Sequence, residues 1–364
     1  EAIRHFSLVH LVRPLSKENI RQLQMYLGEN HPSIVDRLRI YSLEFDLAKN
    51  SSEKNRVIVK CAAHFDMSMD SDLEMYCHWL GKMGEMTRLT QAISLGRASR
   101  SEKLFKVRLA ALANLGMFEE LEIELEQTTV LQDHWRYAFG ARALSANRKF
   151  AEAEVRLNKL VDTIYDDGKK VYAVCKWFQE SRDEPSLCHL LEKLSDEPTY
   201  ETFCAEGLLK YRGATAELEK IQGWITKLAR ANPIDLKLQN SRLYWSLLSP
   251  NPTQKQLDEW LEVSRKHLSR SPEDLQFRVT NALALLRKDF PVEALSVLED
   301  DLASSRRTAW ARIRPAWARI FAVALALNQR TEESITLLNL LSNKSSSFAE
   351  TKTLAKLFPS TLEQ

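Results

Sequence analysis

Apolar residues recur along most of the chain at the spacing of an α-helix. Between residues 104 and 115, leucine and valine side chains gather on one side of such a helix, and Gly116 follows as a residue that ends helices. A second apolar run extends from Phe118 to Leu125. The two runs predict a pair of antiparallel helices joined by a tight turn. Runs that alternate between apolar and polar residues, as half-buried strands do, are not found between turn signals.

This unit of helix, turn and helix recurs further along the chain. Turn signals lie at residues 147–149, 288–289 and 328–330, each between two apolar runs. Small residues such as Gly140 and Ala294 occur in both helices of a pair. They would let two helix axes approach to about 8–10 Å, so the helices of each pair are expected to interlock.

Prolines give the period of the repeat. Pro198, Pro233 and Pro272 are separated by 35 and 39 residues, and each is expected in the first turn of a new helix, where its missing N–H is not needed. A period of about 34–40 residues, together with the predominance of helical patterns, is the signature of a helical solenoid.

The placement of small and large residues from about residue 101 to residue 341 resembles the tetratricopeptide repeat (TPR) family. It is closest to bacterial TPR proteins in which the array follows a membrane anchor, and segments 290–295 and 316–322 look like the closing units of those arrays. The resemblance implies an all-α, right-handed superhelical solenoid of antiparallel helix pairs. It also implies a non-enzymatic scaffold that binds a peptide or protein partner on its concave face, through aromatic and arginine anchors.

The expected organisation has three parts. Residues 1–100 form irregular N-terminal helical pairs continuous with the array, and residues 101–342 form the TPR-like repeats. Residues 343–364 form a Ser-rich linker and a C-terminal capping helix.

Composition supports this picture and adds a limit on partners. The chain of 364 residues has only 10 Gly and 11 Pro, fewer turn residues than a β-rich protein needs. The 51 Lys and Arg nearly balance the 49 Asp and Glu, for a formal net charge of +2. No overall field attracts polyanions, so an electrostatic partner must meet a local patch.

Localisation is indicated only indirectly. The longest apolar stretch, Ile320 to Leu327, is far shorter than the roughly 18–20 residues of a membrane helix. The chain starts at Glu1 rather than at Met, which leaves room upstream for an anchor or signal. The family resemblance implies the soluble part of a bacterial membrane-anchored protein, and the alternative is a cytoplasmic protein.

The strongest candidate surface is a basic and aromatic segment that contains no acidic residue. Arginines there can grip carboxylates or phosphates, while tryptophans anchor a peptide or stack on bases. The candidate partner-binding residues are Arg306, Arg307, Trp310, Arg312, Arg314, Trp317 and Arg319. An alternative interpretation places Trp310 and Trp317, seven residues apart, against the core with the arginines in water. A nucleic-acid-binding helical solenoid that uses segment 306–319 is the first alternative function, although the near-neutral charge disfavours it.

A metal site or an enzyme in the N-terminal region is the second alternative. Cys61 and His64 are one helical turn apart, and Cys77 or His78 on a following helix would complete a tetrahedral set. The competing interpretation is that these are core residues. All five cysteines lie inside helical patterns, which predicts buried thiols. No nucleotide-binding or catalytic motif is found, so we assign no catalytic residue, cofactor or metal ligand.

Opposite charges also follow one another in two successive runs. A basic run extends from Arg97 to Arg108, and an acidic run extends from Glu119 to Glu126. Packed as a hairpin, the two would neutralise each other, which predicts a solvated face crossed by salt bridges.

Overall fold

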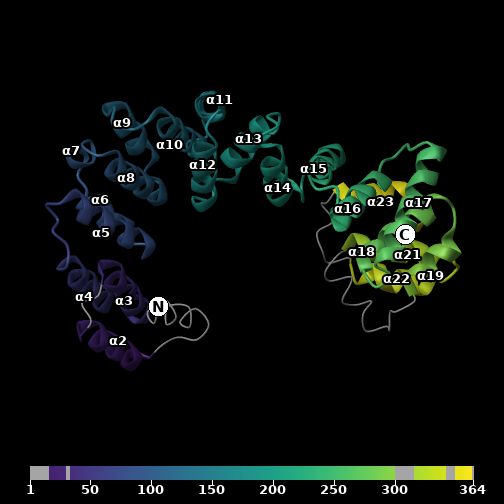
Figure 1. The fold of residues 1–364 in the computed structure, drawn as a ribbon, viewed down its shortest axis with the longest axis horizontal. Helices are drawn as coiled ribbons and strands as arrows, with labels where there is room; N and C mark the ends of the chain where they lie inside the picture. The colour runs from purple at the N-terminus through teal and green to yellow at the C-terminus, as the bar shows by residue number, and fades with distance from the viewer. Residues whose placement is uncertain (1–15, 30–32, 300–314, 342–348, 363–364) are drawn as a thin grey trace. The chain divides into compact units, whose positions relative to one another are not determined.

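The computed structural model describes residues 16–29, 33–299, 315–341 and 349–362, and all regular structure within these ranges is helical (Figure 1). The predicted all-α class is confirmed. The chain divides into two compact units, residues 1–186 and residues 187–364. Each unit has its own hydrophobic core and is described separately.

Unit 1 contains short to medium helices in close succession. Its helices are α2 (Lys17–Glu29), α3 (Ile34–Leu47), α4 (Ser51–Ala62), α5 (Asp70–Lys82), α6 (Met86–Ala92), α7 (Leu95–Ala98), α8 (Glu102–Leu115), α9 (Phe118–Gln127), α10 (Asp133–Ala146), α11 (Phe150–Ile164) and α12 (Gly168–Glu180). Helix α13 (Glu184–Leu194) begins at the end of this unit.

Unit 2 continues the same alternation of helices and short turns. Its helices are α14 (Glu201–Arg212), α15 (Leu218–Ala231), α16 (Leu236–Leu247), α17 (Gln254–Arg270), α18 (Leu275–Arg287), α19 (Pro291–Glu299), α21 (Pro315–Leu327), α22 (Thr331–Asn339), α23 (Ala349–Leu357) and α24 (Pro359–Leu362). The described helices include none that is long and apolar enough to span a membrane.

One type of turn closes six of the helix pairs. In each, a residue with positive φ is followed by a residue whose N–H donates to the carbonyl five positions back, as Met117 does to Leu112 at 3.0 Å and Lys149 to Leu144 at 2.9 Å. This is the Schellman arrangement, which satisfies the last carbonyl groups of the first helix. The left-handed residues are Gly84, Gly116, Arg148, Arg182, Asp289 and Gln329.

These turns show the repeat directly. The predicted turns at Gly116 and at residues 147–149, 288–289 and 328–330 are confirmed. The same turn also occurs at Gly84, and the steps from Gly84 to Gly116 and from Gly116 to Arg148 are both 32 residues long. A regular turn spacing therefore begins inside the N-terminal region for which the sequence predicted irregular pairs. The boundary at residue 100 remains a prediction.

The helices of each unit form two rows. In unit 2 the first helices of successive pairs, α16, α18 and α21, pack on one another, and we call them the first row. Their partners α17, α19 and α22 form the second row, and α18 touches both α17 and α19. In unit 1, α10 packs between α9 and α11, touches α12 and meets Lys106 of α8, and we call α8, α10 and α12 its first row and α9 and α11 its second row.

Burial follows this arrangement. Helix α18 is buried at every position from Val279 to Leu286, and α21 from Ile320 to Leu325. A helix that is buried all round must be covered on every side. Second-row helices cover one side and first-row neighbours cover two more. Small residues allow the close crossings: a Cβ at Gly207 would lie 2.6 Å from Cδ1 of Leu191.

The prolines differ from the expectation. Pro233 and Pro272 lie in the turns ahead of α16 and α18, not within the first helical turn. The reason is local, because the side chains of Asp235 and Asp274 accept backbone N–H groups of the following residues and start each helix after the aspartate. Pro198 similarly precedes α14.

Candidate functional site

Only the end of the predicted basic segment lies within the described residues. Arg306, Arg307, Trp310, Arg312 and Arg314 fall in residues 300–314, outside those ranges. Trp317 and Arg319 lie on first-row helix α21. Trp317 is partly buried against the core of unit 2. Its role and that of the arginines in partner binding remain predictions.

Arg319 is half-buried beside the C-terminal helix α23. Burial lowers the pKa of its guanidinium, and the nearby carboxylate of Glu350 on α23 opposes that shift. Glu350 also accepts a hydrogen bond from the hydroxyl of Tyr244 on α16, with 2.5 Å between Oη and Oε1. An acid from α23 thus bonds a side chain of first-row helix α16 and lies in the electrostatic field of one from α21.

Unit 1 carries an aromatic and cationic cluster on its first row. Trp135 and Phe139 of α10 both contact Trp177 of α12, with ring centroids 6.1 Å and 4.4 Å apart. A cation lies over each indole: Lys106 Nζ is 4.9 Å from the centroid of Trp135, and the guanidinium carbon of Arg142 is 5.5 Å from that of Trp177. We call Lys106, Trp135, Arg142 and Trp177 the tryptophan cluster.

Helical periodicity explains why these side chains converge. Trp135, Phe139 and Arg142 stand at positions i, i+4 and i+7 of α10 and so share one face. A different face of α10, with Gly140 and Leu144, lines a groove of about 470 Å³ shared with α9 and α11. The tryptophan cluster therefore points away from the second row, and both indoles stay only partly buried. Sequence reasoning did not find it, because it joins helices 42 residues apart.

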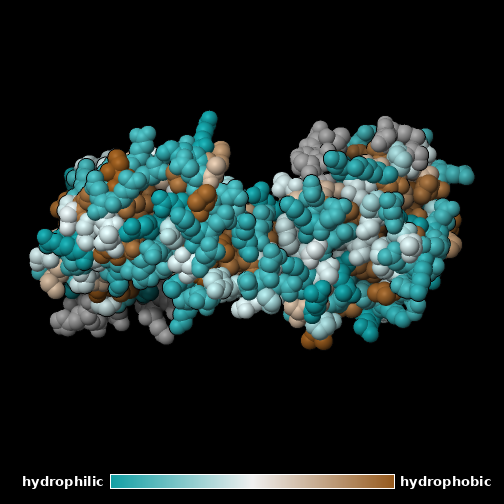
Figure 2. All heavy atoms as spheres, turned by 90° about the horizontal axis from the view of Figure 1, so that it is seen from above, coloured by the Kyte–Doolittle hydropathy of each residue, from teal (hydrophilic) through white to brown (hydrophobic). Residues whose placement is uncertain are grey.

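The visible surface is mostly hydrophilic, with apolar side chains in separate patches (Figure 2). Among the exposed apolar residues of unit 1 are Ile123 on α9 and Phe150 and Val155 on α11. They belong to the second row, next to the groove of α9 to α11, whose lining contains both acidic and basic side chains.

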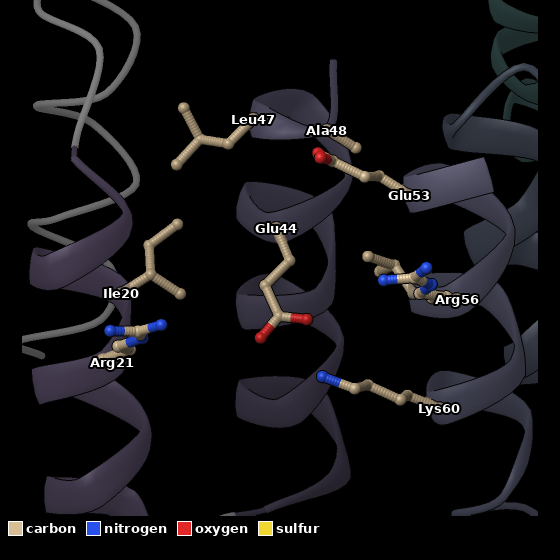
Figure 3. Close-up of a pocket in the computed structure, with 9 residues that line it drawn as sticks. Ile20, Arg21, Glu44, Leu47, Ala48, Glu53, Arg56 and Lys60 are labelled. Atoms are coloured by element: carbon tan, nitrogen blue, oxygen red, sulfur yellow. The ribbon is translucent and has the colours of Figure 1, made fainter. Parts of the chain in front are cut away.

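A second groove lies near the N-terminal end of unit 1, between α2, α3 and α4 (Figure 3). It measures about 380 Å³, and the carboxylate of Glu44 lies between Arg21 and Lys60. Burial raises the pKa of Glu44, and Lys60 opposes that change. The polar side chains that line this groove are the charged groups of glutamate, arginine and lysine residues, so it offers charged contacts.

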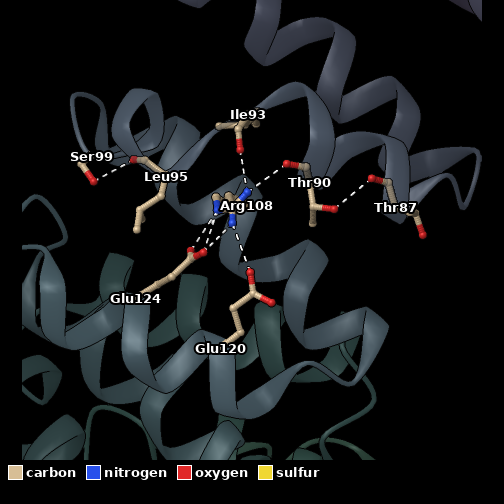
Figure 4. Close-up of polar contacts among 8 residues, drawn as sticks. All are labelled: Thr87, Thr90, Ile93, Leu95, Ser99, Arg108, Glu120 and Glu124. Atoms are coloured by element: carbon tan, nitrogen blue, oxygen red, sulfur yellow. Dashed lines mark hydrogen bonds and ion pairs between the residues drawn. The ribbon is translucent and has the colours of Figure 1, made fainter.

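The charged runs of unit 1 differ in part from the prediction of a solvated face (Figure 4). The side chains of Arg108 and Glu124 are 10% and 3% exposed, so the prediction was wrong for this pair. Arg108 also donates to the carbonyls of Thr90 and Ile93, at 2.9 Å and 2.7 Å. These carbonyls lie at the end of α6, where no further helical N–H is available to them. The guanidinium of Arg108 satisfies them, and this favours a buried position for the side chain.

The candidate metal ligands are not brought together. Cys61 and Cys77 are fully buried, and burial raises the pKa of each thiol to about 12. His64 and His78 are exposed, with Nδ1 atoms 3.1 Å from Arg37 Nη1 and 3.2 Å from the carbonyl oxygen of Glu74. Across the ranges that the structure describes, no three His, Cys, Asp or Glu side chains form a metal-binding group. All five cysteines are buried free thiols, which confirms that prediction.

No protein-family model matches the chain, and no curated protein matches it. Similar solved structures include the APC/C hetero-tetramer Cut9–Hcn1, at 10% identity over 96% of this chain and 76% of that one, with a TM-score of 0.32. The TPR domain of P58(IPK) is 11% identical over 100% of this chain and 98% of that domain, with a TM-score of 0.27. Naa15/Naa10 bound to HypK-THB is 14% identical over 98% of this chain and 57% of that one, with a TM-score of 0.28. The fold assignment rests on the helix pairs and turns described above.

Proposed function

We propose that this chain is a non-enzymatic scaffold that binds a peptide or protein partner on the face of its first-row helices. The observation that carries the proposal is the tryptophan cluster of unit 1, in which two partly buried indoles each have a cation over the ring. Tryptophan and arginine are among the residues that contribute most to binding at protein interfaces, and the rigid indole loses little entropy when it is covered.

The cluster is already held in place before a partner arrives. Trp135 and Trp177 meet edge to face, Phe139 packs against Trp177, and Arg142 donates to the carbonyl of Ser181 at 3.4 Å. Binding to such a surface costs little reorganisation. Lys106 already meets Glu102 Oε1 at 3.5 Å, so Arg142 is the cation that favours a partner segment with a carboxylate beside its apolar side chains.

The test is an affinity pull-down from source-cell lysate with the full chain as bait, in nuclease-treated and untreated halves. Baits are the wild type, Trp135→Ala with Trp177→Ala, Lys106→Glu with Arg142→Glu, and Tyr165→Ala as a matched exposed aromatic control directly after second-row helix α11. We expect one defined protein to be enriched equally in both halves by the wild type and the control. Both cluster variants should enrich this protein at least about tenfold less, and a tenfold loss of affinity is equivalent to about 1.4 kcal/mol of binding free energy.

Two outcomes would contradict the proposal. If folded cluster variants retain full enrichment, the binding surface lies elsewhere. If enrichment disappears with nuclease, the nucleic-acid alternative takes its place, and it then predicts binding that weakens steeply with salt.

Tethering to a bacterial membrane, implied by the family resemblance, is part of the proposal. It predicts that the native protein sediments with membranes and is released by detergent.

A further inference from the structure

The C-terminal helix of unit 2 does not continue the repeat. Helix α22 is already paired with α21 through the turn at Gln329, whereas α23 packs on α21 and reaches α16 through side chains. Tyr244 and Glu350, which form that bond, are 106 residues apart in the chain. Helix α23 therefore lies on the first row itself and does not extend the array by one more pair.

Its contacts are those of an amphipathic helix bound in a groove. Leu354 is fully buried in the same core cluster as residues of α16, α18 and α21, and Leu357 and Phe358 are partly buried against it. Thr351 is also buried, while Lys352 and Lys356 are exposed and line a groove beside the helix. An acid at one position and apolar residues four, seven and eight positions later form one helical stripe.

The first-row face of unit 2 provides a matching site for each part of that stripe. Tyr244 donates to the carboxylate of Glu350, Arg319 is near enough to interact with it electrostatically, and the core cluster receives Leu354. A groove of about 620 Å³ runs along α23 beside the start of α15 and the turn before α17, so this side of the helix is not closely packed.

We infer that the first-row face of unit 2 is a helix-binding site that the chain covers with its own C-terminal helix. The partner is an amphipathic helix with a carboxylate followed by apolar residues at about four, seven and eight positions, and it binds by displacing α23. This inference rests on the proposed function in one respect, that first-row faces receive partners.

The physical basis of the competition is proximity. A tethered segment meets its site at an effective concentration of the order of millimolar, so a separate helix must bind well to replace it. Any change that weakens the contacts of α23 raises the fraction of open sites and improves the apparent affinity for an added helix by the same factor.

The test uses the full chain and a fluorescent peptide with the sequence of residues 349–362, followed by fluorescence anisotropy. Four proteins are compared: wild type, Glu350→Lys, Leu354→Asp, and Glu259→Lys as a matched charge-reversal control at an exposed residue of second-row helix α17 that does not line the groove. Two further peptides, carrying Glu350→Lys or Leu354→Asp, test whether the acid and the leucine are needed for binding. Because Leu354→Asp can fail to fold, circular dichroism is recorded for all four, and Glu350→Lys provides a variant without a core change.

We expect the apparent Kd for the native peptide to be at least about tenfold lower for Glu350→Lys and Leu354→Asp than for wild type and Glu259→Lys. The two altered peptides should bind these two variants less tightly than the native peptide does. Equal binding by all four proteins, or no binding by folded variants, would show that α23 is a fixed cap. Wild-type dimers in light scattering that are lost in Leu354→Asp would also overturn the inference, because α23 would then exchange between copies. The pull-down with the Trp135 and Trp177 variants concerns unit 1 and decides the proposed function separately.

Discussion

The single Nε–H of Arg108 on α8 is shared between the two carboxylate oxygens of Glu124 on α9, at 3.0 Å and 2.9 Å, Nη2 also donates to Glu124, and this pair is buried. The guanidinium also bonds the carbonyls of Thr90 and Ile93 and the carboxylate of Glu120. A single arginine thus joins α8, α9 and the end of α6. Because its donors are matched by acceptors, the desolvation cost of the charges is offset as long as both partners are present.

Removing one partner should therefore be costly. Glu124→Ala leaves the buried guanidinium without its main acceptor, and we expect the free energy of unfolding to fall by about 3–5 kcal/mol. Urea denaturation followed by circular dichroism measures this. Glu120, which is 42% exposed, is the matched control, and Glu120→Ala should cost less than about 1 kcal/mol. A loss below about 1 kcal/mol for Glu124→Ala would mean that the pair does not stabilise unit 1.

The repeated turns predict opposite effects for two substitutions. Arg148 has φ 61° and Gly116 has φ 75°, in turns with the same hydrogen bond. A left-handed conformation strains any residue with a Cβ, so Arg148→Gly should stabilise the chain by about 0.5–1 kcal/mol. Gly116→Ala should destabilise it by about 1 kcal/mol, and since no atom lies within 4 Å of the new Cβ, the cost is conformational alone.

Thermal unfolding of both variants tests this prediction. Gly96→Ala is the control, because its Cβ also meets nothing within 4 Å and its φ is not in the left-handed region. A stabilised Gly116→Ala, or a destabilised Arg148→Gly, would show that these turns are not strained in the way proposed.

The contact between Gly207 and the side chain of Leu191 predicts a destabilising substitution. A Cβ at Gly207 would lie 2.6 Å from Leu191 Cδ1, so this buried leucine must move, and Gly207→Ala should destabilise unit 2 by about 1 kcal/mol after the gain in helix propensity is subtracted. Gly223 of α15 is exposed and meets nothing within 4 Å, so Gly223→Ala should instead stabilise the helix by about 0.5–1 kcal/mol. Urea unfolding curves compare the two, and effects of the same sign would contradict the packing argument.

Acid should weaken unit 2 through His267. Burial lowers the pKa of this histidine, and the nearby Arg270 and Arg242 lower it further. The unfolded chain takes up a proton as the pH falls through about 6.5, while the folded histidine stays neutral. The stability that His267 contributes is therefore fully present above that pH and is lost as the pH falls towards the lower folded pKa.

Melting temperatures measured between about pH 7.5 and pH 5.5 test this dependence. His267→Gln should reduce the fall in melting temperature compared with wild type, and Lys266→Gln, which changes an exposed neighbour, should leave it unchanged. Identical pH dependence in His267→Gln and wild type would show that the histidine titrates alike in the folded and unfolded chain.

Local features of the fold could be predicted from the sequence, and the contacts of the candidate sites could not. The turns near Gly116 and Arg148 depend on a few neighbouring residues, and the sequence shows those residues. Trp135 meets Trp177, and Tyr244 meets Glu350, only because distant helices pack together. One signal was present, since Arg108 stands four residues after Leu104 and four before Leu112 on the apolar side of α8, and this position indicates burial.

Because the turns at Gly84, Gly116 and Arg148 are each 32 residues apart, one complete repeat can be removed between two of them. If residues 117–148 are removed, Lys149 follows Gly116 directly, and its N–H stands where that of Met117 now donates to Leu112. The new turn then has the same length and the same hydrogen bond as the existing turns. Duplication or loss of whole repeats can therefore lengthen or shorten the chain without requiring a new type of turn.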